Sequence, residues 1–380
     1  MPFTFTSEHA EFERAVADIA RKEFYDGYLA RATSDEPCRA EVAKLGAAGL
    51  LGLGLPEAAG GQGADPISVG IAVEQIARAD IALASLVAQT SALPSCLWDG
   101  LPRHVGGPVL RSLTSGESVM ALALTEPGGG SDLTGMSVTA RRADGGYRLF
   151  GEKTSVTLGM WAEHAIVVAR AEGDGPKTRR FLVPLDRPDI ARQRFQDPGF
   201  RPLGRAALGF DGTFVPADHE IGGPRSGLSA QLADLDFMRT LIGLMCVGLA
   251  RRAMDETVEW VRRREAFGVP IARHQGVSFT LAEHETRLEA ARLLSYRSLA
   301  LRAAGERHSR EASMCKWWAP QLAVQAVNDC IVIHGHTGWS NEMPLQQLLL
   351  DVSGLQIGDG TPQIQKLVIA RELIGREYTG

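Results

Sequence analysis

The chain has 380 residues, 44% of them hydrophobic and 22% charged, which fits a soluble globular protein of two or three domains with a sizeable core. Its formal net charge of −5, without any block of Lys and Arg, argues against nucleic acid as a partner. The five cysteines are widely spread and form no CxxC pair, so neither a disulfide framework nor a metal site is expected, and a reducing cytoplasm fits best.

The apolar segments argue against a membrane protein. The first residues, MPFTFTSEHAEFERAVAD, are charged and amphipathic, unlike a signal peptide or a membrane anchor. The longest apolar run, LIGLMCVGLA from Leu241, is far too short to span a bilayer and predicts a buried helix segment.

Residues 1–118 predict an N-terminal α-helical domain. This part is rich in Ala and Leu, and Phe12, Val16 and Ile19 recur at helical spacing. Ser7, which is followed by acidic residues, is a candidate helix start. The Gly- and Pro-rich stretch LGLGLPEAAGGQGAD interrupts the helices and predicts a loop.

Residues 119–223 predict a β domain. Short β-rich runs alternate with polar turn sequences such as ADGG. The clearest runs are YRLF (Tyr147–Phe150), AIVVAR (Ala165–Arg170) and RFLVPL (Arg180–Leu185). Because no helical segment lies between them, they predict a small antiparallel barrel or sandwich rather than a doubly wound sheet.

Residues 224–380 predict a C-terminal helical bundle. Spacings of four and three alternate along one helix face that comprises Val277, Leu281, His284, Leu288 and Ala291. A β domain inserted between two helical domains would create interdomain clefts, where ligands commonly bind.

Several familiar catalytic motifs can be excluded. His284-Glu285 begins a zinc-protease pattern, but Leu288 stands where the second histidine is needed. Ser313 to Lys316 reads S-x-x-K without the companion SDN and KTG motifs, so chance explains it better. GDGPKT around Lys177 lacks the residue order of a phosphate loop, and no GxGxxG follows a strand, so no nicotinamide site is expected.

Residues suited to ligand binding concentrate in four segments, namely Ala121–Met136, Phe150–Arg170, Arg262–Glu283 and Ile333–Gln365. In the first, consecutive glycines let the backbone approach a flat ligand, and Thr125 and Ser131 can hydrogen-bond it. In the third, Arg264, Phe267 and Gln275 surround a Gly-Val-Pro break, and arginine suits a pyrophosphate. A flexible loop and a solvated basic face remain the alternatives.

The stretch LQIGDGTPQIQ, Leu355–Gln365, contains the most interesting acid. Asp-Gly is among the commonest turn dipeptides, so Asp359 fits a simple turn. It also fits an acid placed for chemistry, and the local sequence leaves both interpretations open.

In this order and at these intervals, the segments resemble the acyl-CoA dehydrogenase family over almost the whole chain. The motifs that carry the resemblance are GLLGLGLPEAAGGQG, TEPGGGSD, GEKTSVT, REAFGVPI with its downstream Gln, GHTG, EMP and GTPQI. The resemblance implies an α-helical domain, a β-barrel domain and a C-terminal four-helix bundle. It also implies FAD as cofactor and a homotetramer or homodimer.

The resemblance carries over to individual residues. The residues that match positions contacting or seating FAD are Leu124, Thr125, Ser131, Thr157, His336, Thr361 and Gln363. Ser131 also matches a contact to the pantetheine arm of the substrate. Arg264 and Gln275, with Phe267 in the same segment, match positions that hold the FAD of a neighbouring subunit, so the oligomer would be part of the site.

The implied reaction is α,β-dehydrogenation of an acyl thioester, in which a carboxylate removes the α-proton and the β-hydrogen leaves as hydride to the flavin. Asp236 and Arg239 match the acid and the arginine that line the thioester cavity. The family's usual base is a Glu directly before Gly-Thr, and Asp359 stands there with an arm one methylene shorter. Gly358 precedes it where a Tyr is common. The base residue's backbone N–H would help to hold the developing enolate oxygen.

Other departures bear on the partner and the substrate. Electron-transfer flavoprotein is the implied acceptor, although Ser155 stands where an aromatic residue often shields the flavin. Leu350 replaces the Arg of an Arg-Asp pair that ends at Asp351. The GDGT ending is one associated with members in secondary metabolism, which often act on acyl carrier protein thioesters.

Three hypotheses follow. The leading one is an FAD-dependent dehydrogenase of an acyl-CoA or an acyl carrier protein thioester. The second is a flavin oxidase or monooxygenase on the same scaffold, with Asp359 as base on a different carbon acid. The third is a catalytically inactive FAD-binding or scaffold subunit, against which the retained Asp359 and Arg264 argue.

Overall fold

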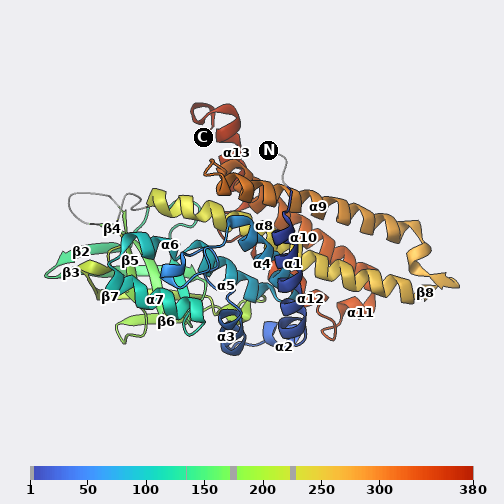
Figure 1. Ribbon diagram of the computed structural model, residues 1–380, viewed down its shortest axis with the longest axis horizontal. Helices are drawn as coiled ribbons and strands as arrows, with labels where there is room; N and C mark the ends of the chain where they lie inside the picture. Colours follow the sequence, from blue (N-terminus) through green and yellow to red (C-terminus); the bar gives the residue numbers. More distant parts are fainter. Residues whose placement is uncertain (1–3, 134, 172–177, 223–227, 380) are drawn as a thin grey trace.

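The computed structural model describes residues 4–133, 135–171, 178–222 and 228–379, and the side chains of residues 228–233 are also left out. The predicted boundary between residues 223 and 224 and most of the GDGPKT segment lie outside the described residues. Figure 1 shows a sheet at one end of an elongated molecule, the N-terminal helices near the middle and the tip of a helical hairpin at the other end.

The N-terminal part is helical, as predicted. Its helices are α1 (Ser7–Ala20), α2 (Tyr28–Ala32), α3 (Arg39–Ala47), α4 (Pro66–Ala79), α5 (Ile81–Ala92), α6 (Ser95–Gly100) and α7 (Arg103–Ser115). Helix α1 begins at Ser7, and the side chain of Thr6 accepts a hydrogen bond from the His9 backbone N–H to cap it. The predicted loop before α4 contains only a single 3₁₀ turn, Glu57–Ala59.

One segment of this part was overlooked in the sequence. The stretch Ile81–Gly100, which contains α5 and α6, is long and apolar enough to cross a membrane by length and composition alone. Within the fold, 89% of its most apolar window is buried, which is the environment of a core helix. Length and apolar composition cannot separate these two cases, whereas burial against other helices can.

The middle part is a curled seven-stranded sheet in the order β1-β4-β2-β3-β7-β6, with β5 paired to the other side of β4. The strands are β1 (Met120–Ala123), β2 (Thr139–Ala143), β3 (Gly146–Val156), β4 (His164–Ala171), β5 (Thr178–Pro184), β6 (Ile190–Arg194) and β7 (Ala206–Pro216). The three β runs predicted from the sequence all fall on strands, β3, β4 and β5.

The sheet is mixed rather than purely antiparallel, which corrects one part of the predicted architecture. Strands β1 and β2 both pair in parallel with β4, β1 with its first half and β2 with its last two residues. The described residues between these two short strands form no helix, so the parallel pairing is made without a crossover helix there. The TEPGGGSD segment therefore leaves the sheet at its edge, next to β4.

The C-terminal part is the predicted helical bundle. Its elements are α8 (Leu228–Arg263), β8 (Glu265–Ala266), β9 (Val269–Pro270), α9 (Gln275–Ala303), α10 (Ser309–His334), α11 (His336–Trp339), α12 (Leu345–Gly354) and α13 (Pro362–Ile374). Helices α8, α9 and α10 lie side by side, and α13 packs on α10 (Figure 1). His284, Leu288 and Ala291 are buried on α9, which confirms the predicted face.

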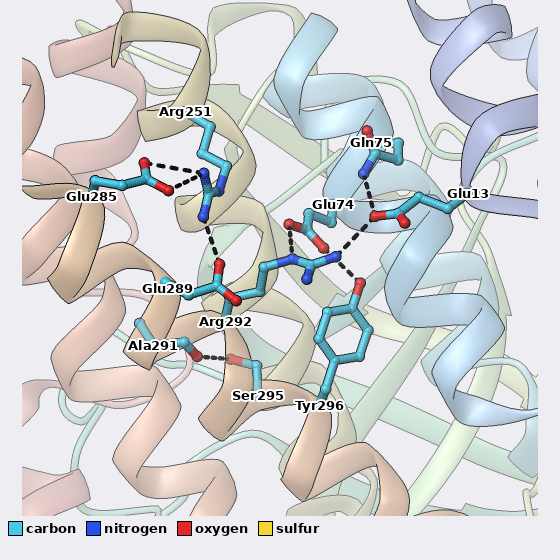
Figure 2. Close-up of polar contacts among 10 residues, drawn as sticks. All are labelled: Glu13, Glu74, Gln75, Arg251, Glu285, Glu289, Ala291, Arg292, Ser295 and Tyr296. Atoms are coloured by element: carbon cyan, nitrogen blue, oxygen red, sulfur yellow. Dashed lines mark hydrogen bonds and ion pairs between the residues drawn. The ribbon is translucent and has the colours of Figure 1, made fainter. Parts of the chain in front are cut away.

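A buried polar network joins the N-terminal helices to this bundle (Figure 2). Arg292 of α9 donates hydrogen bonds to Glu74 of α4 at 2.7 Å and to Glu13 of α1 at 2.8 Å. The hydroxyl of Tyr296 donates to Glu74 at 2.6 Å. Because the guanidinium is matched by two carboxylates, this network fixes α1 and α4 against α9.

Candidate active site

Asp359 lies in the loop between α12 and α13, in an uncommon backbone conformation. Its φ is 54°, in the left-handed region, and that of Gly360 is 99°. The carbonyl oxygen of Asp359 accepts hydrogen bonds from Arg239 Nε at 3.2 Å and from Gln365 Nε2 at 3.1 Å. The backbone N–H of Asp359 donates to no other group in the described part of the chain. The loop is thus held by its carbonyl groups.

The predicted substrate residues Asp236 and Arg239 lie together, one turn apart on α8. Arg239 Nη1 donates to Asp236 Oδ1 at 2.8 Å, and Ser309 Oγ donates to Asp236 Oδ2 at 2.6 Å. Asp236 therefore holds the guanidinium in the orientation that reaches Asp359. The structure makes Arg239 a support of the predicted base through the base's own backbone.

Burial and the neighbouring positive charges shift the pKa of Asp359 in opposite directions. Burial raises the pKa of its carboxyl, because desolvation disfavours the charged form. The positive charges of Lys316 and Arg239 lower it in part, and the net direction is upward. A carboxylate with a raised pKa is a stronger base and so is better matched to abstracting a weakly acidic proton.

The predicted flavin-contacting segment, Leu124 and Thr125, follows β1 and approaches α8. Leu124 shares a small apolar cluster with Leu235, which directly precedes Asp236. The Leu124 carbonyl accepts a hydrogen bond from Lys153 Nζ at 3.0 Å, and the Thr125 carbonyl accepts one from the Thr154 N–H at 2.9 Å. The two hydrogen bonds tie the end of β1 to β3, and the apolar cluster brings it to α8, the helix that supports Asp359.

A buried ion pair shapes the loop that follows. Lys153 also donates to Glu126 at 2.7 Å, and Glu126 accepts hydrogen bonds from the backbone N–H groups of Ser137 and Val138. Burial lowers the pKa of Lys153 to about 8 despite this partner. Residues 126 and 137 are thereby drawn together at the base of the TEPGGGSD segment.

The residues on this side fit the isoalloxazine ring of FAD. Thr125 and Thr157, which directly follows β3, are half-buried, and neither hydroxyl has a partner among the described residues. A Cβ built on Gly128 would meet no atom within 4 Å, so the loop leaves room beside it. Ser131 is exposed on the same loop. Free hydroxyls beside open space suit the polar edge of a flat ring.

A second group of predicted residues lies far from Asp359. Arg264 and Phe267 are at the tip of the α8–α9 hairpin, where β8 lies in Figure 1, and Gln275 begins α9. Arg239, which holds Asp359, lies about 36 Å along α8 from the end of the helix at Arg263, so this tip cannot reach Asp359 within one chain. Phe267 is 96% exposed. His336 is exposed in α11, toward the same end of the bundle.

Thr361 and Gln363 lie next to the Asp359 loop, at the start of α13. Thr361 is the N-cap residue of α13, and its carbonyl accepts a hydrogen bond from the Gln365 N–H. Gln363 is exposed in the first turn of α13. The structure therefore divides the predicted site residues into a group around Asp359 and a group at the hairpin tip.

The structure shows the contacts made at two places where the sequence departs from the family pattern, Ser155 and Asp351. Ser155 is exposed, has a φ of 56°, and accepts a hydrogen bond from Arg205 at 3.1 Å. Asp351, which lacks an arginine neighbour at position 350, instead accepts a hydrogen bond from the Tyr28 hydroxyl at 2.6 Å. Burial raises the pKa of Asp351 to about 6.

Sequence reasoning missed two residues of this site, Lys316 and Gln365. Both are fully buried, and both donate hydrogen bonds to carbonyl groups of the Asp359 loop. A signal was present for Lys316, because it interrupts a helix stripe of small apolar residues comprising Ala312, Ala319 and Ala323. Among the described residues, no group of three or more His, Cys, Asp or Glu side chains is placed to hold a metal ion.

Comparison with known proteins identifies the family. The descriptions "Acyl-CoA dehydrogenase, N-terminal domain", "middle domain" and "C-terminal domain" match residues 6–99, 121–213 and 225–374. The chain belongs to the acyl-CoA dehydrogenase family. Members of this family are FAD-dependent oxidoreductases that act on CH–CH groups, and this chain is one of them.

Individual relatives cover nearly the whole chain. An acyl-CoA dehydrogenase of Bacillus subtilis is 32% identical over 97% of this chain and 99% of its own length. Benzylmalonyl-CoA dehydrogenase of Aromatoleum aromaticum is 34% identical over 98% of this chain and 100% of its own length. The structure of butyryl-CoA dehydrogenase from Megasphaera elsdenii superposes with a TM-score of 0.91 at 25% identity and covers 98% of this chain and 100% of that one. The three-part acyl-CoA dehydrogenase fold predicted from the sequence is confirmed.

Proposed function

We propose that this acyl-CoA dehydrogenase removes the α- and β-hydrogens of an acyl thioester carried by CoA or by an acyl carrier protein, with Asp359 as the base. The observation that carries the proposal is the state of Asp359. Partial burial raises the pKa of its carboxyl, its carbonyl accepts hydrogen bonds from Arg239 and Gln365, and its N–H has no acceptor among the described residues.

The residues of the chain divide the work of the reaction. The Asp359 carboxylate takes the α-proton, and the backbone N–H of the same residue donates to the thioester carbonyl as negative charge develops there. Leu124, Thr125, Ser131, Thr157, Thr361 and Gln363 would hold FAD, and bound FAD supplies the hydride acceptor. Because the Asp arm is short, the α-carbon has to approach the loop closely, and the open space at Gly358, whose Cβ would meet no atom within 4 Å, permits this.

The hairpin tip supports an oligomeric site. Arg264, Phe267 and Gln275 are too far from Asp359 to serve their own subunit, so we propose that they contact the FAD of a neighbour in a homodimer or homotetramer. His336 lies toward the same end. The proposal includes a cytoplasmic location, a role in secondary metabolism and electron-transfer flavoprotein as acceptor.

Anaerobic flavin bleaching tests the proposal. The purified protein is mixed with saturated acyl-CoAs of increasing length and with the same acyl groups on carrier proteins, and the loss of flavin absorbance is followed. We expect at least one thioester series to bleach the flavin, with slow reoxidation in air. Asp359→Asn should slow bleaching by about 10³-fold, because the base is removed, while Asp359→Glu keeps a carboxylate and should retain more activity.

Other outcomes would select the competing hypotheses. Rapid oxygen consumption without any thioester would indicate the oxidase. A colourless protein that takes up no FAD would indicate a scaffold subunit. Unchanged bleaching in Asp359→Asn, at equal FAD content, would show that another group is the base.

A further inference from the structure

Lys316 is a buried charge in α10, next to the Asp359 loop, that the reaction as described does not use. It is 0% exposed. Its ammonium donates hydrogen bonds to the Leu355 carbonyl at 2.7 Å and to the Gly360 carbonyl at 3.3 Å. Because a lysine is almost never fully buried without a partner, these contacts call for an explanation.

The two carbonyl groups lie at the two ends of the turn that presents Asp359. Leu355 directly follows α12, and Gly360 directly follows the acid. Gln365 Nε2 of α13 donates to the Gly360 carbonyl as well, at 3.3 Å. Side chains from α8, α10 and α13 thus converge on the backbone of one loop, and within the described part of the chain only Lys316 joins both of its ends.

Burial lowers the pKa of Lys316, and the Asp359 carboxyl acts against that shift. The titratable groups that face Lys316 are Asp359 from the loop and Arg239 and Cys246 from α8. Burial raises the pKa of the Cys246 thiol to about 12, so it is neutral, and Arg239 is already paired with Asp236. The field of the ammonium therefore falls on Asp359.

We propose that Lys316 is a positioning residue for the reaction: it closes the 355–360 turn through two carbonyl groups and places a positive charge next to the half-buried Asp359. Without Lys316, the two consecutive left-handed residues Asp359 and Gly360 would be held only at that end of the turn, by Arg239 and Gln365. This inference rests on the proposed role of Asp359 as base.

Two substitutions separate the charge from the hydrogen bonds. Lys316→Met removes both, and Lys316→Gln removes the charge but keeps a donor. In both, the acidic limb of the pH profile for bleaching by the best acyl-CoA should move upward by about one pH unit, because the carboxylate loses a favourable charge. In Lys316→Met the bleaching rate at pH 7 should fall about 10- to 100-fold with little change in substrate affinity.

Hydrogen exchange of the peptide that covers residues 355–361 gives a readout independent of turnover. Its amides should exchange about 10-fold faster in Lys316→Met and less so in Lys316→Gln. Ser313→Ala, one turn earlier on the same buried face, is the matched control and should change neither readout. If Lys316→Met does not fold, Lys316→Gln decides by its pH profile.

An unshifted pH profile together with unchanged loop exchange in the folded variants would overturn the proposal. So would a rate loss explained entirely by lower FAD content. If Asp359 is not the base, Asp359→Asn keeps its activity. Hydrogen exchange of residues 355–361 in Lys316→Met then still tests whether Lys316 holds the turn.

Discussion

Among the residues that the structure describes, two lysines are fully buried, one in the sheet and one in the helical bundle, and their hydrogen-bond partners differ. Lys153 in β3 forms an ion pair with Glu126 and also holds the Leu124 carbonyl. Lys316 in α10 forms hydrogen bonds only to carbonyl groups, those of Leu355 and Gly360. Each one fixes a loop that borders the candidate site, but only one is neutralised by direct contact with a carboxylate.

The difference in hydrogen-bond partners indicates a different role for each of the two lysines. A buried ion pair is coupled to the fold, because removal of one partner leaves the other charge unpaired in a poorly solvated place. A buried ammonium that contacts only neutral groups keeps its field available to a nearby acid. We therefore expect Lys153 to matter chiefly for stability and Lys316 chiefly for the reactivity of Asp359.

The most direct test of this contrast compares Lys153→Met with Lys316→Met by urea unfolding. Lys153→Met should lower the free energy of unfolding by about 3 kcal/mol, because it leaves the Glu126 carboxylate buried without its cation. Lys316→Met should cost only about 1 kcal/mol, because neutral carbonyl groups remain. Equal losses in the two variants would break the contrast and make Lys316 a structural residue.

A third buried ionisable group, Asp351, extends the comparison of the two lysines. Asp351 is 1% exposed and contacts neutral donors, among them Tyr28 and Gln347. Its pKa is raised from 3.8 to about 6 by burial, so the folded state binds its proton more tightly than the unfolded state does. The stability that this group contributes is present at low pH and is lost as pH rises from about 4 to about 6, by about 3 kcal/mol.

Asp351→Asn should remove this pH-dependent contribution to the free energy of unfolding. Urea unfolding of the wild type and of Asp351→Asn is measured from pH 4 to pH 7, and the difference between the two proteins isolates the group from other carboxylates. Parallel curves over this range would show that Asp351 does not ionise with a raised pKa.

The smallest expected effect concerns the loop itself. Gly360 has a φ of 99°, and a Cβ there would collide with Gln365 Nε2. Gly360→Ala should therefore cost about 1–2 kcal/mol of unfolding free energy and slow thioester bleaching. Gly358→Ala is the matched control for stability, since its Cβ would meet no atom within 4 Å, and we expect a change below about 0.5 kcal/mol. A stable Gly360→Ala would show that the loop can move away from its donors.

Much of the fold and part of the candidate site could be predicted from the sequence, because the patterns that indicate them are local. Helical periodicity around Phe12 and Leu288 and the β runs such as AIVVAR predict the three-part layout, and TEPGGGSD and GTPQI predict the family and FAD. The parallel pairing of β1 and β2 with β4 was missed, because strand direction depends on where the intervening loop leaves the sheet. The Ile81–Gly100 segment was missed as a membrane-length apolar stretch that the fold buries.

The local sequence is enough to identify a carboxylate directly before Gly-Thr at position 359, with a side chain one methylene shorter than that of Glu. Only the tertiary structure decided that Arg239, Lys316 and Gln365, from three different helices, meet at the backbone around that acid. Packing also places Arg264 and Phe267 away from that acid, at the tip of the α8–α9 hairpin where β8 lies in Figure 1. Periodicity fixes which face of a helix is buried, but the partners on that face come from distant parts of the chain, and packing alone selects them.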